Sequence, residues 1–497
     1  MMKKKFFLLS MIFISVILLS AAALLYIESK GPKNHEKYNV ILVVSDALRK
    51  DVLGCYGGDV PTPNIDWLAE NGILFERAYS TAPSTMPSSV SMLTGNHSRT
   101  YSFAMQKMYK GQPIKHAYYI SDEEILPAER LKETGFDMKA DVENHLAAVS
   151  NTFQGYGFLE FKKKFRKDLI ERVEKATGIS RSDWFEDSEH RWKYKKLYVW
   201  LSHFLNIPQD KRFIFFKWFI DPHSTYDAPQ KYRSRIVFDT SRLGHDPEYL
   251  SGLHAKEVKE LLDADYAYLK KLYKAEVAFL DDRIGYMIKA LAHKKFLDNT
   301  FIFFTADHGE LFMEHGRWGH GGDYYEILVN VPLIVLGPGI PKGKRTDSVV
   351  SLLGLMPTVF DILDIDDPEE MQGKSFYPVL LGKEMEDRTP YFERIPTTLD
   401  VDRILSDGMM MDGFKLIFTR GAGDKKFRLF DLARDPDELR NCAKNNPETV
   451  RKIFSAIQEV REQNRILLIE NQKELAMDTE EQTERTLERL RALGYIK

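Results

Sequence analysis

Long apolar runs constrain the fold of this chain more than any other feature of its sequence. The run Asn39-Val-Ile-Leu-Val-Val-Ser45 carries no charge. Residues 301–305 and 331–336 are also uncharged, and residues 213–220 are apolar except for Lys217. Such runs are typical of strands buried on both faces, because a strand with one wet face alternates apolar and polar residues. Residues 261–294 have the spacing of a helix. Strands that alternate with helices predict a doubly wound α/β fold, with a mostly parallel central sheet flanked by helices.

Acidic residues and histidines directly follow three of these runs. Asp46 follows the first, Asp221 and His223 follow the second, and Asp307 and His308 follow the third. Ligands bind beyond the carboxyl ends of the strands in open α/β sheets. Carboxylates together with an imidazole are a ligand set for a divalent cation, although each residue alone is equally consistent with a helix cap. The three strand ends together predict a site at this edge of the sheet.

Hydroxyl side chains are concentrated in the segment Ser80–Gly95, "STAPSTMPSSVSMLTG". Five of its sixteen residues are serine and three are threonine. A hydroxyl beside a bound cation is a strong nucleophile, because the cation lowers the pKa of the hydroxyl. Composition alone does not distinguish a nucleophile here from hydroxyls that cap a helix, and Ser84 and Thr85 are the two candidates.

The N-terminus predicts a membrane anchor. Lys3, Lys4 and Lys5 precede an apolar run of 22 residues, 6–27. Such a run is long enough to cross a hydrocarbon core of about 30 Å. The flanking lysines place the rest of the chain outside the cytoplasm. Cleavage near 21–23 would instead release a secreted protein.

Composition argues against a nucleic-acid-binding protein and against a fold built on disulfides. A net charge of −3 with no long basic stripe gives no reason to expect nucleic acid as a partner. Cys55 and Cys442 are the only cysteines, so the fold cannot depend on a disulfide framework.

At 497 residues, the chain is too long for one small core and divides into segments. The C-terminal part predicts an antiparallel α+β subdomain followed by a charged helical tail. The predicted segments are the anchor or signal sequence at 1–30, the catalytic domain at 38–385 with a helical insertion at 155–210, the subdomain at 386–445 and the tail at 446–497.

A collinear set of motifs resembles the sulfatase family of the alkaline phosphatase superfamily, from Tyr38 to the end of the chain. The motifs are "PTPNIDWLAENGILFERAY", "TMPSSVSMLTG", "FFKWFIDPHSTYDAPQKY", "TADHGELFMEHGRWGHGG", "MQGKSFYPVLLG" and "FRLFDLARDPDELRN". The resemblance implies an alkaline-phosphatase-like fold. It also implies roles for seven residues. The metal ligands would be Asp46, Thr85, Asp307 and His308, with Thr85 as the nucleophile. The residues that contact the transferred group or the leaving oxygen would be His223 and His320, with Arg49 as a weaker candidate.

Several departures from the family pattern concern the reaction itself. Thr85 stands where hydrolytic sulfatases have the Cys or Ser that becomes formylglycine, and threonine cannot yield that aldehyde. Ser89 replaces the arginine that supports formylglycine, and Ala47 replaces a second metal-binding aspartate. Glu143 and His320 replace two lysines. The resemblance therefore implies the branch with a threonine nucleophile and no formylglycine.

These features together predict a hydrolase or transferase that acts on phosphate mono- or diesters. The expected substrate is an ester attached to a lipid or a glycan. The expected cofactor is a divalent ion, with Mn²⁺, Mg²⁺, Zn²⁺ and Ca²⁺ all compatible with the ligands. Two alternatives stay open. One is a sulfuric ester hydrolase with an atypical nucleophile, and the other is a non-catalytic binding or envelope-assembly protein.

Overall fold

The computed structural model describes most of the chain after residue 33. The described residues are 34–104, 107–109, 112–114, 117–119, 126–144, 156–158, 167–179, 191–235, 238–253, 261–366, 371–394, 406–423 and 426–475. Among them, no helix combines the length and the apolar character needed to cross a membrane. The predicted anchor at 1–30 lies outside the described residues, as does the end of the predicted tail after Leu475.

A nine-stranded sheet forms the centre of the molecule, with the order β14-β2-β13-β10-β1-β9-β7-β8 and β15 paired to β2. Strands β10, β1, β9, β7 and β8 are mutually parallel. Their bounds, with those of the other strands of this sheet, are β1 Asn39–Ser45, β2 Ile73–Tyr79, β7 Asp137–Val142, β8 Gly157–Phe158, β9 Phe213–Phe219, β10 Thr300–Ala306, β13 Asn330–Leu336, β14 Lys344–Thr346 and β15 Val350–Ser351. The predicted α/β fold with a mostly parallel sheet is therefore confirmed.

Strand β13 is the exception to the parallel arrangement. It was expected as a strand from its apolar run, and it pairs antiparallel with both β10 and β2. The reason lies in the connection from β10, which contains only short elements: β11 (Leu311–Phe312), β12 (Trp318–Gly319) and the four-residue helix α13 (Glu326–Val329). Parallel strands are usually joined through a crossover helix, and this connection, which the structure describes throughout, contains no helix longer than four residues.

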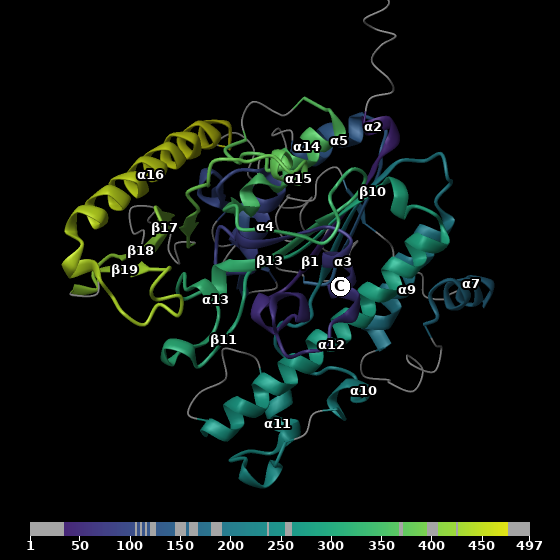
Figure 1. Ribbon diagram of the computed structural model, residues 1–497, viewed down its shortest axis with the longest axis horizontal. Helices are drawn as coiled ribbons and strands as arrows, with labels where there is room; N and C mark the ends of the chain where they lie inside the picture. The colour runs from purple at the N-terminus through teal and green to yellow at the C-terminus, as the bar shows by residue number, and fades with distance from the viewer. Residues whose placement is uncertain are drawn as a thin grey trace, which may run out of the picture.

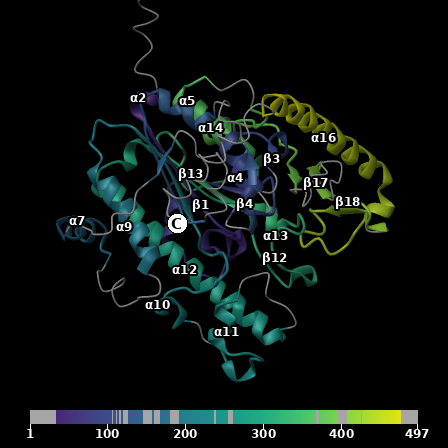
Figure 2. The same cartoon turned by 180° about the vertical axis from the view of Figure 1, so that it is seen from behind.

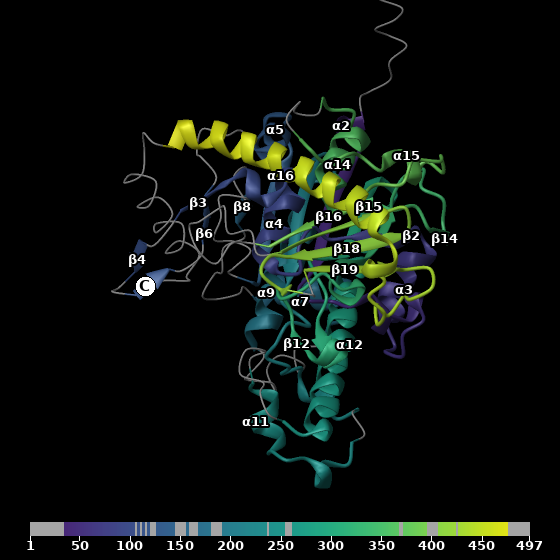
Figure 3. The ribbon, with the colours of Figure 1, turned by 90° about the vertical axis from the view of Figure 1, so that its left-hand side faces the viewer.

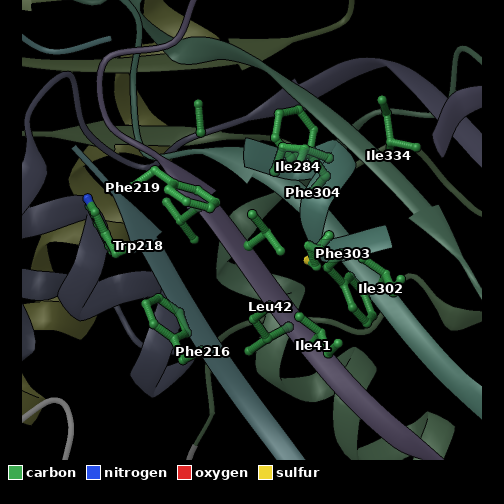
Figure 4. Close-up of a cluster of buried hydrophobic side chains, with 14 of the residues drawn as sticks. Ile41, Leu42, Phe216, Trp218, Phe219, Ile284, Ile302, Phe303, Phe304 and Ile334 are labelled. Atoms are coloured by element: carbon green, nitrogen blue, oxygen red, sulfur yellow. The ribbon is translucent and has the colours of Figure 1, made fainter. Parts of the chain in front are cut away.

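The central strands are buried on both faces, which accounts for their continuous apolar sequences. All seven residues of β1, of β9 and of β10 are buried. Figure 4 shows Leu42 of β1 beside Phe216 of β9, and Ile41 of β1 beside Ile302 of β10. Burial on this scale is the main favourable term in folding, at about 25 cal/mol per Å² of apolar surface.

Helices cover both faces of the sheet (Figures 1 and 2). One face carries α3 (Pro63–Glu70), α7 (Lys167–Thr177), α9 (Arg191–Asn206) and the long α12 (Asp263–His293). The other carries α4 (Thr85–Thr94) and α14 (Leu355–Leu363). The predicted insertion at 155–210 contributes α7 and α9, which pack against α12, and Trp200 of α9 belongs to the main core.

A second, four-stranded antiparallel sheet follows the central one in sequence, as Figure 3 shows from its side. Its strands are β16 (Tyr391–Glu393), β17 (Ser406–Met411), β18 (Phe414–Thr419) and β19 (Phe427–Asp431). Helix α16 (Pro447–Leu475) packs on this sheet through Ile453 and Ile457, which are buried with Leu416 and Leu429. The C-terminal α+β arrangement predicted from the sequence is confirmed.

Candidate active site

The carboxyl ends of three neighbouring strands lie at one edge of the central sheet. Ser45 of β1 is paired with Ala306 of β10 and with Phe219 of β9. The N–H of Asp46 donates to the Phe219 carbonyl at 3.0 Å, and that of Asp307 donates to the Ser45 carbonyl at 3.3 Å. These bonds extend the ladder by one residue, so the polar residues that follow each strand emerge side by side.

Helix α4 brings Thr85 to this edge as its first residue. Ser88, one turn further along, donates from its hydroxyl to the Asp307 carbonyl at 2.8 Å and so ties the start of α4 to the end of β10. The Thr85 Oγ1 atom lies 3.4 Å from Asp46 Oδ1 and 3.3 Å from His308 Nε2. Other hydroxyls of the segment, such as that of Ser89, donate to carbonyls of their own helix. Of the two predicted candidates, Thr85 is the one whose hydroxyl contacts the acidic residue and the histidine.

The two carboxylates of the site are each held by hydrogen bonds to one oxygen. Asp46 Oδ2 accepts from the Asn144 amide and, at 3.2 Å, from the Trp218 indole. Asp307 Oδ1 accepts from the N–H of Ala47 at 3.0 Å and from that of His308 at 2.8 Å. Ala47 has a left-handed backbone (φ 57°), and it supplies an N–H at the place where the family pattern has a second aspartate.

The remaining atoms of this group converge on one point. His308 Nε2 lies 3.8 Å from Asp46 Oδ1 and 3.3 Å from Asp307 Oδ2. One potential ligand atom from each of the three residues lies within 4.8 Å of the other two. The other nitrogen of His308, Nδ1, lies 2.8 Å from the Gly309 carbonyl, which requires the proton to be on Nδ1 and leaves the lone pair on Nε2. Within the described part of the chain, Asp307 Oδ2 is buried and has no hydrogen-bond partner. An orphaned carboxylate oxygen beside a second buried carboxylate fits a bound cation.

The electrostatics of the cluster agree with this fit. Burial above all, and then the charge of Asp46, raise the pKa of Asp307 well above its ordinary value. Burial above all, and then the neighbouring His320, lower the pKa of His308 to about 3, so its imidazole is neutral at pH 7 and can act as a ligand. A divalent cation bound by Asp46, Asp307 and His308, with Thr85 as the fourth ligand, would neutralise both carboxylates. Carboxylate oxygens with one imidazole nitrogen do not select among Mn²⁺, Mg²⁺, Zn²⁺ and Ca²⁺.

His223 and His320 lie against this cluster, as the sequence predicted. The ring centre of His320 is 4.4 Å from that of His308 and 5.1 Å from that of His223. His320 Nδ1 lies 2.9 Å from Glu310 Oε1, and His223 Nδ1 lies 2.6 Å from the Ser224 carbonyl. Each ring is therefore oriented through Nδ1.

The guanidinium of Arg49 makes its contacts within the protein. Its guanidinium donates to Asp51 at 2.7 and 2.9 Å, to Glu314 at 2.8 Å and to the Glu310 carbonyl at 3.2 Å. The side chain is buried, and two carboxylates match its charge. Arg49 thus braces the loop that carries Glu310, and its role in contacting the substrate stays a prediction.

Three residues of the site were missed in the sequence: Asn144, Trp218 and Glu310. Asn144 follows Glu143, whose carboxylate is buried in ion pairs with Lys217, at 2.7 Å, and with Arg283. Burial would raise the pKa of Glu143, but Arg283 and then Lys217 hold it below its ordinary value. Glu143 thus anchors the end of β7, and Asn144 is held within reach of Asp46. Proximity of these residues to the predicted motifs was the only signal in the sequence.

The pair of Arg49 and Glu314 leads to a prediction about acid stability. Burial would raise the pKa of Glu314, but the charge and hydrogen bond of Arg49 lower it from 4.5 to about 2. Ionised Glu314 therefore stabilises the fold above pH 4.5, and this contribution disappears as the pH falls from 4.5 to about 2. We expect Glu314→Gln to lower the free energy of unfolding at pH 7 by roughly 1–3 kcal/mol. We also expect the difference from wild type to shrink across that acidic range.

Urea unfolding at a series of pH values measures both effects. Glu448→Gln is the matched control, because Glu448 is 85% exposed in its pair with Arg451. The control should change stability by less than about 0.5 kcal/mol. A Glu314→Gln deficit that stayed constant from pH 7 to pH 2 would contradict the prediction.

Comparisons with known proteins identify similar sequences and folds. A model of the sulfatase family matches residues 38–365, and a model described as N-sulphoglucosamine sulphohydrolase, C-terminal, matches residues 314–465. Arylsulfatase K of Gallus gallus is 26% identical over 473 residues, which cover 87% of this chain and 84% of the relative. An arylsulfatase of Clostridium perfringens is 27% identical over 447 residues, which cover 82% of this chain and 90% of the relative.

A solved structure extends the similarity to the fold. The phosphonate monoester hydrolase of Agrobacterium radiobacter superposes with a TM-score of 0.65. It is 18% identical, and the match covers 86% of this chain and 96% of that chain. An identity this low supports the fold alone.

Proposed function

This chain belongs to the sulfatase family and is an ester hydrolase of the alkaline phosphatase superfamily, and from that premise we propose that it cleaves phosphate-type esters with Thr85 as the nucleophile. The observation that carries the proposal is the position of the Thr85 hydroxyl, 3.4 Å from Asp46 Oδ1 and 3.3 Å from His308 Nε2. The attacking group of the family is expected at this place beside the metal ligands. A threonine Cβ bears a methyl group, so its oxidation cannot give the aldehyde used by formylglycine sulfatases.

The residues of the cluster have different roles in the proposed reaction. Asp46, Thr85, Asp307 and His308 would hold a divalent cation, and such an ion would lower the pKa of the Thr85 hydroxyl. Thr85 would then give up its proton to water before the attack. The Thr85 oxygen then bonds to phosphorus, and the leaving oxygen departs with the electron pair of the broken bond. His320 lies beside the cluster as a donor to that oxygen, and water releases the group from Thr85 in a second step.

Sulfate esters are the second candidate substrate, favoured by the names of the relatives. Both curated relatives described above are arylsulfatases. Phosphate and sulfate esters present similar tetrahedral groups, so the same arrangement of ligands suits either. A non-catalytic role is the weakest alternative, because Asp46, Thr85, Asp307 and His308 all converge on one point. We further propose that the apolar run at 6–27 tethers the enzyme to a membrane, with the site outside the cytoplasm.

Parallel assays of the full-length protein in detergent test the ester class. We expect 4-nitrophenyl phosphate or bis(4-nitrophenyl) phosphate to be cleaved faster than 4-nitrophenyl sulfate when Mn²⁺, Mg²⁺, Zn²⁺ or Ca²⁺ is added. Acid quenching during turnover should trap a phosphate on the peptide that contains Thr85, as detected by mass spectrometry. Preferred cleavage of the sulfate, or turnover of phosphates with Thr85 never modified, would contradict the proposal.

A further inference from the structure

Glu310 is a buried carboxylate that lies at the site but is outside the group of metal ligands. It is fully buried. Its Oε1 atom lies 2.9 Å from His320 Nδ1, and its Oε2 atom lies 3.5 Å from the Tyr226 hydroxyl, which donates to it. The backbone carbonyl of Glu310 accepts from Arg49 at 3.2 Å. Contacts to both carboxylate oxygens and to the carbonyl thus hold this residue in one position.

The local fold explains why Glu310 meets His320. Gly309 donates to the Leu328 carbonyl at 2.8 Å, and a Cβ at Gly309 would lie 1.9 Å from the carbonyl oxygen of Ile327. Only glycine permits this approach of the loop to α13. The β11–β12 hairpin then pairs Leu311 with Gly319. In an antiparallel pair, the residues just outside Leu311 and Gly319 are also opposite one another, and these are Glu310 and His320.

The hydrogen bond to Glu310 fixes the orientation of the His320 ring through Nδ1. Since Nδ1 is engaged by Glu310, Nε2 lies on the side of the ring that is turned away from Glu310. The centre of the His320 ring is 4.4 Å from the centre of the His308 ring. The family resemblance places a lysine at this position. A lysine ammonium donates in any rotation about its last bond, whereas an imidazole must be held in one orientation to present the correct nitrogen.

We propose that Glu310 is a positioning residue that holds His320 so that Nε2 donates its proton to the leaving oxygen. This inference rests on the proposed function for the attacking group, Thr85. As the Thr85 oxygen bonds to phosphorus, the bond to the leaving oxygen breaks, its electron pair stays on that oxygen, and the Nε2 proton moves to it. In the second step, a water attacks phosphorus and gives one proton to Nε2, while the bond between phosphorus and the Thr85 oxygen breaks and its electron pair stays on that oxygen. Glu310 remains a carboxylate throughout, and its effect on the rate is transmitted entirely through His320.

A double-mutant cycle with two leaving groups tests this role. The variants are Glu310→Ala, Glu310→Gln, His320→Ala and the double variant with alanine at both positions, assayed with phenyl and 4-nitrophenyl phosphate. We expect Glu310→Ala to lower kcat by roughly 10–100-fold. The loss should be larger for phenyl phosphate, because the poorer leaving group depends more on proton donation. The same Glu310→Ala change made in the His320→Ala background should lower kcat by less than about threefold.

Two variants separate positioning from a structural role. Glu310→Gln is nearly isosteric and keeps an oxygen that can accept from Nδ1, so its loss should lie between wild type and Glu310→Ala. It also keeps the test available if the alanine variant fails to fold. Glu314→Gln is the matched control, since Glu314 is a partly buried carboxylate of the same hairpin and pairs with Arg49. Glu314→Gln should change kcat by no more than about twofold with either leaving group.

The outcomes distinguish this inference from the proposed function. An equal loss from Glu310→Ala in both backgrounds, or an equal loss with both leaving groups, overturns the role of Glu310. If phosphothreonine forms at Thr85 while the cycle shows no coupling, only this inference fails. If the enzyme cleaves sulfates and not phosphates, the proposed ester class fails, and the same cycle with phenyl and 4-nitrophenyl sulfate decides the role of Glu310.

Discussion

Thr85→Ala should abolish turnover of every ester that the enzyme cleaves, with a loss of at least ~10³-fold in kcat. The change removes the hydroxyl that lies between Asp46 and His308 and replaces it with a residue that suits the first turn of a helix. Because three metal ligands remain, we expect the variant to fold and to retain a divalent ion. Steady-state kinetics, circular dichroism and metal analysis of the purified variant measure these three properties.

Ser84→Ala is the matched control for this prediction. Ser84 is the N-cap of α4 and makes no side-chain capping bond there. Its loss should therefore change kcat by no more than a few-fold and leave stability within about 1 kcal/mol of wild type. Activity close to wild type in Thr85→Ala, or complete loss in Ser84→Ala, would show that the nucleophile has been assigned to the wrong hydroxyl.

Asp307→Asn should remove the divalent ion, and with it the activity and the stabilisation that the ion provides. In the wild type, a bound ion stabilises only the folded state, so chelation with EDTA should lower the Tm. Asp307 loses a charge in the variant, and the Asp46–Asp307 repulsion disappears with it. We therefore expect the Tm of Asp307→Asn to be insensitive to EDTA and equal to or above that of the chelated wild type. kcat should fall by roughly 10²–10⁴-fold.

Calorimetry with and without EDTA, together with metal analysis, measures these effects. Asp51→Asn is the matched control, because Asp51 pairs with Arg49 and is 53% exposed. That variant should keep both the metal and the response to EDTA. Full metal content in Asp307→Asn, or an unchanged response of its Tm to EDTA, would contradict the assignment of Asp307 as a ligand.

Apolar runs located the centre of the fold correctly. The runs at 39–45, 213–220 and 301–305 became β1, β9 and β10, because strands buried on both faces tolerate few charges. The run at 331–336 was also a strand, but its direction depended on the connection before it. Residues 307–329 form short loops and a hairpin instead of a crossover helix, so β13 returned antiparallel. A local pattern records burial, whereas strand direction depends on how the intervening chain folds.

The candidate metal ligands could be found in the sequence because they directly follow buried strands or begin a helix. Asp46, Asp307 and His308 are fixed to the ends of β1 and β10 by backbone bonds, so their placement follows from the strands themselves. Arg49 shows that position along the chain does not determine where a long side chain makes its contacts. It is three residues beyond Asp46, yet its long side chain reaches Asp51 and Glu314. A flexible side chain is directed by whichever opposite charges the fold brings near it.

The sequence by itself determined the α/β architecture, the family and the short side chains at the strand ends, since these depend on burial patterns and on residues adjacent along the chain. Only the tertiary structure decided which atoms of those side chains face one another. Asn144 and Trp218 hold Asp46, and Glu310 holds His320, across 98, 172 and 10 residues of sequence. These contacts depend on hydrogen bonds between separate elements, whose geometry appears only after the sheet has assembled and its loops have packed.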